Sequence, residues 1–314
     1  MTSQPGEAAP RVSIGMPVYN GERFLNEALD SILSQTYRDF ELIISDNAST
    51  DRTAAICEEY AAQDPRIKYI RNASNVGAAK NYNIVFRLAK GEYFKWAAHD
   101  DICQPTFIER CVNILDEQPA VVVCSPKALI IDINGQPTGH YPYRLVFTAV
   151  RPYERFRQFF KVKGFHPIFG VIRSSALAET GLIGNFEMAD RVLLGELVLW
   201  GEFAEVPEFL FLRRKHDQIS TKANPTDRQL AAWYDPSNQY RIILPSWRRL
   251  VEYMRAIHRS PLRWHEQMRC YLYLTQFLLV PHKWKTMLRD LVQAARPIPS
   301  LWLRRRTRKE GPVR

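Results

Sequence analysis

Three consecutive side chains, His99, Asp100 and Asp101, could bind a metal ion or hydrogen-bond a ligand. They follow an apolar, aromatic stretch, residues 91–98, whose composition is typical of a buried β-strand. In an open α/β sheet, ligands bind at the carboxyl ends of the strands. Two adjacent carboxylates beside an imidazole could hold a divalent cation through oxygen, or they could cap the next helix. These residues alone leave both interpretations open.

Strand-like and helix-like patterns alternate around this cluster. Apolar runs at 12–17, 40–45 and 66–71 precede the strand that begins at residue 91, and helical periodicity occupies 24–35, 54–61 and 78–89. This alternation predicts an α/β fold with a mostly parallel, doubly wound sheet flanked by helices. The loops after the strands carry Tyr19, Asn20, Asp46 and Gly77. We expect these residues and the acidic cluster to meet at one edge of the sheet.

The pattern continues to about residue 213. Helices are predicted at 105–117, 152–160 and from 187 through 199, and strands at 120–124, 128–133, 169–173, 203–207 and 209–213. The segment RRKHDQIS, which begins at Arg213 and contains His216, follows the last of these strands.

Length and composition are those of a globular protein with one large domain and an appendage: 314 residues, 46% hydrophobic and 24% charged. Five cysteines without CxxC spacing argue against a disulfide framework or a zinc site and are typical of reduced thiols in the cytosol. The polar residues 1–10 are expected to be a disordered leader. No apolar run is long enough to predict a transmembrane helix.

Positive charge is concentrated in the last quarter of the chain. Residues 241–314 contain 17 Lys and Arg against 4 Asp and Glu, whereas residues 1–240 contain 26 against 29. Predicted helices at 247–258, 266–279 and 283–295 interleave tryptophans with these cations, a composition typical of elements at an anionic membrane surface. The alternative is a set of helices packed on the preceding domain. No nucleic-acid-binding motif is present, so we expect no nucleic-acid partner.

The stretch MPVYNGERFLNEALDSILSQTYRDFELIISDNASTD resembles the N-terminal half of the family 2 glycosyltransferases, which have the GT-A fold. Asn75, Val76 and Gly77, followed by Asn83 and the GEY strand, continue the similarity in register. The resemblance implies a Rossmann-like GT-A domain at 11–220. Composition adds a leader at 1–10 and a basic helical region at 221–314. It also implies an inverting transfer of a sugar from a nucleoside-diphosphate donor, with a UDP-sugar favoured, to a saccharide or lipid-linked saccharide.

The resemblance assigns roles to individual residues. It implies that Asp46 binds the nucleotide base, which Tyr19 flanks or stacks on, and that Asp190 is the general base. It implies that Asp100 binds a divalent metal, Mg²⁺ or Mn²⁺, with His216 completing the shell. Further nucleotide-sugar contacts are expected from Pro17, Asn20, Glu22, Gly77, Asn83, His99 and Arg213. From the residues alone, Asp46 could be a turn residue, Asp190 a helix-terminal carboxylate and Arg213 part of a solvated face.

Two positions depart from the family pattern: Ala98-His99 stand before Asp100 where many relatives have D-x, and Ala189 replaces the first acid beside Asp190. A non-catalytic nucleotide-sugar-binding or membrane-scaffold protein is therefore the alternative to an enzyme. For the enzyme we expect a role in cell-surface polysaccharide or glycolipid synthesis. Its expected location is the cytoplasm, with peripheral attachment to the inner face of the membrane, and we expect the acceptor to approach residues 163–169.

Overall fold

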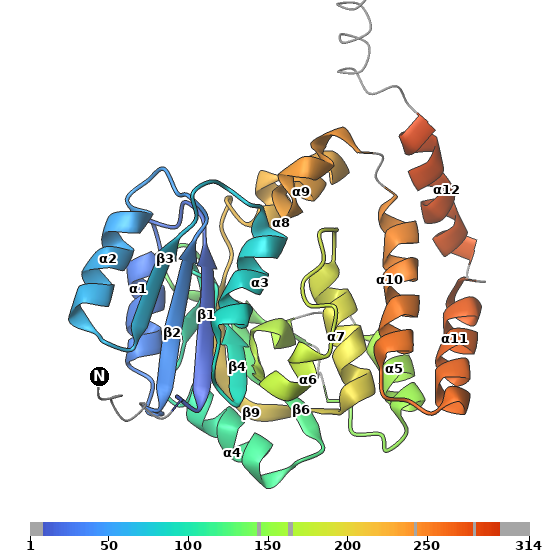
Figure 1. The fold of residues 1–314 in the computed structure, drawn as a ribbon, viewed down its shortest axis with the longest axis horizontal. Coiled ribbons are helices and arrows are strands. Elements are labelled where there is room, and N and C mark those ends of the chain that lie inside the picture. The colour runs from blue at the N-terminus through green and yellow to red at the C-terminus, as the bar shows by residue number, and fades with distance from the viewer. Residues whose placement is uncertain (1–8, 143–145, 163–165, 242–243, 279–280, 296–314) are drawn as a thin grey trace, which may run out of the picture.

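The computed structural model of the chain describes residues 9–142, 146–162, 166–241, 244–278 and 281–295 (Figure 1). The strands are β1 (Val12–Val18), β2 (Phe40–Asp46), β3 (Ile67–Arg71), β4 (Tyr93–Trp96), β5 (Ile102–Cys103), β6 (Val121–Ile131), β7 (Pro137–His140), β8 (Val171–Arg173) and β9 (Glu202–Arg214). The α-helices are α1 (Leu25–Leu33), α2 (Thr53–Gln63), α3 (Ala78–Leu88), α4 (Phe107–Glu117), α5 (Pro152–Lys161), α6 (Ser174–Ala178), α7 (Ala189–Trp200), α8 (Ser220–Ala223), α9 (Asp227–Tyr234), α10 (Pro245–Arg259), α11 (Trp264–Leu278) and α12 (Pro281–Ala295). Two short 3₁₀-helices are η1 (His166–Phe169) and η2 (Pro236–Tyr240).

Within the described residues, the strands form one sheet in the order β3-β2-β1-β4-β8-β6-β9-β5, with β7 paired to β6. β1 pairs in parallel with β2 and β4, and β2 pairs in parallel with β3. β8 runs antiparallel to β4 and β6, while β6 and β9 are parallel and β5 is antiparallel to β9. The carboxyl ends of β1 to β4 therefore meet at one edge, as predicted.

Apolar side chains on the two faces of the sheet form two cores. Alternate residues of a strand point to opposite faces, so Ile14 and Leu42 pack with α1 and α4, whereas Ile43 packs with α3 and α7 on the other side. All seven residues of β1 are buried, which fits a central strand covered on both faces. The helices are seen on either side of β1 and β2 in Figure 1. The mostly parallel α/β architecture is confirmed.

Two of the predicted strand breaks are wrong. The runs at 120–124 and 128–133 form the single strand β6, and those at 203–207 and 209–213 form the single strand β9. The prolines between them, Pro126 and Pro207, are accommodated where the β6–β9 pairing changes register. A proline cannot donate to the ladder, but an irregularity in the pairing absorbs that loss without ending the strand.

The described part of the last quarter of the chain is mostly helical, as predicted. α10 packs against α7, and α11 and α12 pack against α10. None of the helices in the described residues is long and apolar enough to cross a membrane. The predicted leader lies mostly outside the described residues, and so does the basic run at 304–309.

Candidate functional site

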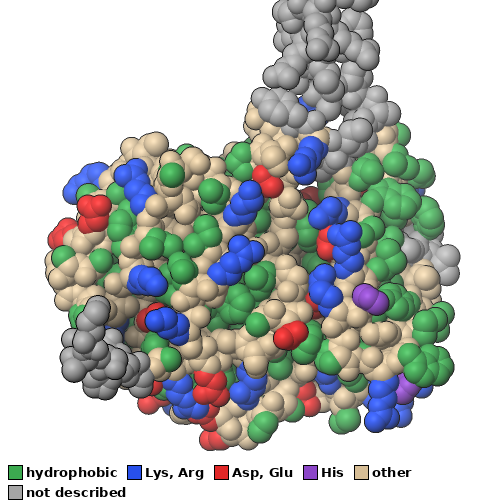
Figure 2. Space-filling model, in the orientation of Figure 1, with side chains coloured by type: hydrophobic (Ala, Val, Ile, Leu, Met, Phe, Trp, Pro, Cys, Tyr) green, Lys and Arg blue, Asp and Glu red, His purple; other side chains and the backbone are tan. Residues whose placement is uncertain are grey.

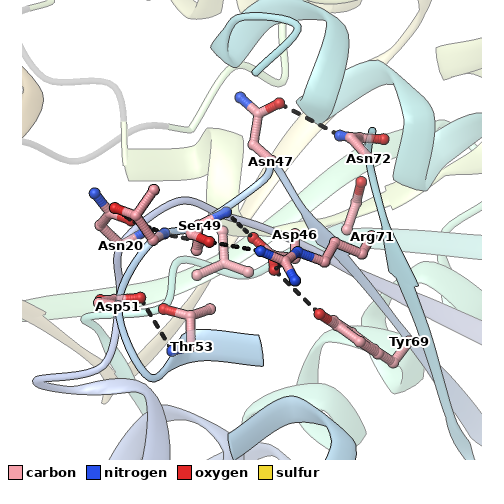
Figure 3. Close-up of polar contacts among 12 residues, drawn as sticks. Asn20, Asp46, Asn47, Ser49, Asp51, Thr53, Tyr69, Arg71 and Asn72 are labelled. Carbon is pink, nitrogen blue, oxygen red and sulfur yellow. Dashed lines mark hydrogen bonds and ion pairs between the residues drawn. The ribbon is translucent and has the colours of Figure 1, made fainter. Parts of the chain in front are cut away.

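The loop after β2 is organised by the carboxylate of Asp46 (Figure 3). Oδ1 accepts a hydrogen bond from the backbone N–H of Ser49 at 2.8 Å, and Oδ2 accepts one from the hydroxyl of Tyr69 at 3.1 Å. Oδ2 also lies 3.4 Å from Nε of Arg71, and the side chain is fully buried. Pro17 is buried in the adjacent strand β1. Asp46 thus fixes the loop from inside, and its recognition of a nucleotide base stays a prediction.

Asn20 and Glu22 hold the same loop from the end of β1. Asn20 has a left-handed backbone, with a φ of 51°, and its Oδ1 accepts the N–H of Thr50 at 2.9 Å. Oε2 of Glu22 accepts the N–H of Arg52 at 2.9 Å, just before α2. Both side chains therefore shape the loop. Tyr19 is different, because it is 42% exposed beside the loop and so can contact a ligand.

Gly77 and Asn83 join the N-terminal half to later parts of the chain. Gly77 has a φ of +86°, and a Cβ there would come within 2.6 Å of the carbonyl oxygen of Tyr234, so the position requires glycine. The side-chain amide of Asn83 bonds both backbone groups of Ile183, at 2.9 and 3.1 Å. Asn83 thereby positions the segment that leads to Asp190.

Asp100 and His216 come together from opposite ends of the domain. Nε2 of His216 lies 2.8 Å from Oδ2 of Asp100, and the N–H of Gln218 donates to Nδ1 of His216 at 3.2 Å. Burial opposes ionisation of Asp100, but the bond from His216 and the nearby charge of His99 outweigh it, so the pKa of Asp100 is lowered. His99 packs against the backbone at Gly21.

Asp101 contacts Arg214, which the sequence offered together with Arg213 and His216 as a group that could approach the diphosphate. Oδ1 of Asp101 accepts the backbone N–H of Arg214 at 2.8 Å, and burial, followed by the charge of Asp100, raises the pKa of Asp101 to about 8. The buried Arg214 side chain donates to the carbonyl of Asp100 at 3.0 Å, to Glu27 at 2.6 Å and to two carbonyls after β6. Arg214 therefore ties α1, β9 and the acidic loop together.

Arg213, one residue earlier, reaches a different group. Its Nη1 donates to the hydroxyl of Tyr141 at 2.7 Å. Burial lowers the pKa of Arg213, but Tyr141 and Asp101 more than offset it, so the net change is upward. His166 stacks near Tyr141 with ring centroids 5.2 Å apart. Of the segment 163–169, only the part from His166 onward is described.

Asp190 lies in the first turn of α7, after Met188, whose φ of 62° is left-handed. Its Oδ1 accepts the backbone N–H of Arg191 at 2.8 Å. Burial raises the pKa of Asp190, and this effect exceeds the lowering by that hydrogen bond and by nearby arginines. A half-buried carboxyl with a raised pKa is suited to proton transfer.

Two tyrosines that the sequence analysis did not assign lie among these carboxylates. Burial raises the pKa of Tyr82, and the charges of Asp100, Asp101 and Asp190 raise it further. Burial and the charge of Asp190 likewise raise the pKa of Tyr234. The acidic cluster after β4 and Asp190 are therefore both near enough to Tyr82 to raise its pKa.

A cavity of about 390 Å³ lies between the segment before α7 and the C-terminal helices. Phe186 and Glu187 line it from the first side, and Asp227, Arg241 and Trp247 line it from the second. Burial raises the pKa of Glu187, which is three residues before Asp190. Aromatic faces with a few polar groups are typical of a ligand site. The C-terminal region thus lines a cavity together with the segment that leads into α7.

The Asp100–His216 pair is the place where a divalent cation would fit. No group of three or more His, Cys, Asp and Glu suited to a metal occurs in the described residues. Mg²⁺, however, is commonly held by one or two carboxylates together with substrate phosphates and water, and the lowered pKa of Asp100 suits that role. Because Nδ1 of His216 accepts a hydrogen bond, the ring proton lies on Nε2. His216 in this arrangement orients Asp100, and it would have to turn to ligate a metal.

The family model described as glycosyl transferase family 2 matches residues 13–181, which are 169 of the 314 residues. The chain belongs to this family. An uncharacterised glycosyltransferase of Rickettsia typhi is 40% identical over 119 residues, which are 37% of this chain and 36% of the relative's length. The similarity to that family 2 relative therefore spans about a third of each protein.

Solved structures extend the comparison of this family 2 chain to most of its length. TarS 1–349 of S. aureus, solved in complex with UDP, has a TM-score of 0.63 and 17% identity, covering 91% of this chain and 81% of the other. The mannosyltransferase PcManGT of Pyrobaculum calidifontis, solved with GDP-Man and Mn²⁺, has a TM-score of 0.52 and 19% identity, covering 92% and 86%. At these identities the likeness concerns the fold, and it confirms the GT-A prediction.

Proposed function

We propose that this family 2 protein is an inverting glycosyltransferase that moves a sugar from a nucleoside-diphosphate donor to a hydroxyl of a saccharide or lipid-linked saccharide. The observation that carries the proposal is the placement of two carboxylates: Asp100 follows β4 and is held by His216, and Asp190 lies in the first turn of α7. The pKa of Asp100 is lowered and that of Asp190 is raised. Carboxyls whose pKa values are pushed apart suit different tasks, here an ionised anchor and a proton acceptor.

Asp190 is the proposed general base. Its carboxylate accepts the proton of the acceptor hydroxyl while the hydroxyl oxygen forms a bond to the anomeric carbon of the donor. The bond from that carbon to the diphosphate breaks, and its electron pair leaves with the nucleoside diphosphate. A single displacement inverts the configuration. Burial of Asp190 supports this role, because a raised pKa makes the carboxylate a stronger proton acceptor.

Asp100 is the proposed anchor at the diphosphate. A bound Mg²⁺ or Mn²⁺ would offset the charge of the departing nucleoside diphosphate. Asp100 would hold the cation, with His216 keeping the carboxylate in place. Arg213, bonded to Tyr141, is the proposed cation near the diphosphate, and its guanidinium is preorganised by that bond.

A UDP-sugar is the donor we favour. TarS is described in complex with UDP and with UDP-GlcNAc, although PcManGT is described with GDP-Man. Tyr19 is the proposed contact to the base because it is exposed beside the loop that Asp46 organises. Asp46 is proposed to act with it, directly on the base or through the loop.

The acceptor is proposed to enter through the cavity beside α7. Phe186 and Trp247 offer aromatic surfaces to a sugar ring, while Glu187 and Asp227 offer oxygen acceptors to its hydroxyls. This places the acceptor next to the first turn of α7. Synthesis of a cell-surface polysaccharide or glycolipid on the cytoplasmic side of the membrane is the corresponding cellular role in this proposal.

The test combines binding and turnover. A panel of UDP- and GDP-sugars is screened by thermal shift with and without Mn²⁺, and the donor that binds is assayed for transfer to saccharide and lipid-extract acceptors. Asp190→Asn should keep donor binding and lose about 10²–10⁴-fold in transfer, whereas the control Glu179→Gln, at an exposed position outside the proposed site, should keep most of it. Transfer that survives Asp190→Asn rejects the assigned base. Donor binding without any turnover favours the non-catalytic alternative.

A further inference from the structure

The last two described helices expose rows of large apolar side chains. On α11, Trp264, Met268 and Leu272 recur every four residues and are 77%, 49% and 57% exposed. On α12 the corresponding residues are Trp284, Leu288, Leu291 and Val292. Spacings of three and four place residues on one face of a helix. Each helix therefore presents an apolar stripe to its surroundings, and we call the two stripes together the α11–α12 face.

The opposite sides of both helices are engaged by the protein. Cys270 and Leu274 of α11 and Met287 of α12 are buried. Asp290 accepts the N–H of Ser246 at 2.7 Å, and this bond fixes α12 against α10. The exposed stripe of each helix therefore lies on the side that does not pack against the rest of the protein. Apolar patches of this kind mark interaction surfaces in soluble proteins.

The charges around the α11–α12 face have one sign. Arg269, Lys285 and Arg289 are exposed on the two helices. The two carboxylates of the described helices are withdrawn: Glu266 is bonded to Arg269 with its side chain 13% exposed, and Asp290 is buried. Figure 2 shows hydrophobic side chains gathered along the margin that α11 and α12 form. The face is therefore apolar and cationic, with no exposed carboxylate among its described residues.

We propose that the α11–α12 face docks on an anionic lipid bilayer, with Trp264 and Trp284 at the headgroup level. Tryptophan, leucine and cations on one helical face are the composition of interfacial helices, and anionic headgroups attract the cations. A second copy of the chain fits less well, because a symmetric pairing would bring the same cations together. The surface is independent of the proposed transferase chemistry, although it would bring the enzyme close to a lipid-linked acceptor.

The experiment is flotation of the full chain with vesicles of phosphatidylcholine alone and of phosphatidylcholine with phosphatidylglycerol. We expect binding to the anionic vesicles, weakened by salt. The double variant Leu272→Glu/Leu288→Glu should lose more than about tenfold in binding, since it places charge in the apolar stripe. Ile133→Glu is the matched control, because Ile133 is 45% exposed in the turn that follows β6. Circular dichroism melts show whether each variant is folded.

A second double variant tests the contribution of the cations to vesicle binding without changing the apolar stripe. Lys285→Gln/Arg289→Gln leaves the apolar stripe intact and should also weaken binding to anionic vesicles. The proposal is overturned if the native chain ignores anionic vesicles at low salt, or if the folded double variant binds them as well as the native chain does. It is also overturned if the native chain is a dimer in analytical ultracentrifugation that Leu272→Glu/Leu288→Glu dissociates, since the face would then be an interface between copies.

Discussion

Both ring nitrogens of His216 make hydrogen-bond contacts. Nε2 lies 2.8 Å from Oδ2 of Asp100, and Nδ1 accepts a hydrogen bond from the backbone N–H of Gln218. The second bond leaves the ring proton on Nε2, where it is donated to the carboxylate. Asp100 is thereby held from the side of β9, a strand more than a hundred residues later in the chain. This geometry favours a role for His216 in orienting Asp100 over a role as a metal ligand.

The role of His216 predicts a difference between two substitutions. His216→Ala removes the donor to Asp100 and should weaken Mn²⁺-dependent UDP binding by about tenfold or more. His216→Gln keeps an N–H near the position of Nε2 and should retain most of the binding. Asp100→Ala should abolish the Mn²⁺ dependence. Calorimetric titration of UDP with and without Mn²⁺ measures all three, and equal losses in the Ala and Gln variants would instead make His216 a metal ligand.

Arg214 is predicted to matter for stability. Its guanidinium is fully buried and donates to Glu27 and to backbone carbonyls, including that of Asp100. Arg214→Ala leaves those carbonyls without their donor, and it should reduce the free energy of unfolding by about 3 kcal/mol. Lys215→Ala, at the exposed next position, should change it by less than about 0.5 kcal/mol. Urea unfolding gives both values, and similar small losses would refute the structural role of Arg214.

The role of Asp46 can be tested by comparing a ligand that carries a nucleotide base with a ligand that contains only phosphates. Asp46→Asn should weaken binding of UDP while leaving Mn²⁺-dependent binding of pyrophosphate unchanged, because only UDP carries a base. Asp51→Asn is the control, since Asp51 accepts the N–H of Thr53 at the start of α2. Calorimetry with the two ligands measures the contrast. Parallel losses for UDP and pyrophosphate would show that Asp46 acts by general loop stability and not on the base.

Local sequence signals predicted most of the fold. The apolar run at 12–17 and the helical periodicity at 24–35 are within two residues of β1 and α1, because hydrophobic spacing determines which face is buried. The pattern failed at Pro126 and Pro207. Whether a proline ends a strand depends on the neighbouring strand, and here the register of β6 and β9 changes to accommodate both. That information lies in the pairing and not in the local sequence.

The candidate site was predicted less completely. Residues at strand ends, such as Asp46 and Asp100, could be found because parallel strands bring their carboxyl ends together. The sequence did not predict that Arg213 and Arg214 make different contacts. Adjacent residues of a strand point to opposite faces, but the sequence does not show which side each residue faces. Arg213 reaches Tyr141, while Arg214 is buried toward Glu27. Choosing between them requires knowing which face of β9 borders the site.

His166 should give the protein a measurable pH dependence of stability. The ring is 2% exposed, neither ring nitrogen has a hydrogen-bond partner among the described residues, and burial together with Arg213 lowers its pKa to about 4. The unfolded chain binds a proton at His166 near the ordinary value of 6.5. Between about pH 6.5 and 4 the unfolded state therefore holds more protons, so the contribution of His166 to stability is present above this window and is lost as the pH falls through it.

This lowered pKa predicts a loss of about 1 kcal/mol in the free energy of unfolding between pH 7 and pH 5.5 that depends on His166. His166→Gln should remove that part of the pH dependence, because glutamine does not titrate. The exposed His258 provides the matched control, and His258→Gln should keep the native slope. Urea unfolding at the two pH values, with the native chain and both variants, measures the difference. If His166→Gln loses as much stability on acidification as the native chain, the buried imidazole is not the group that titrates.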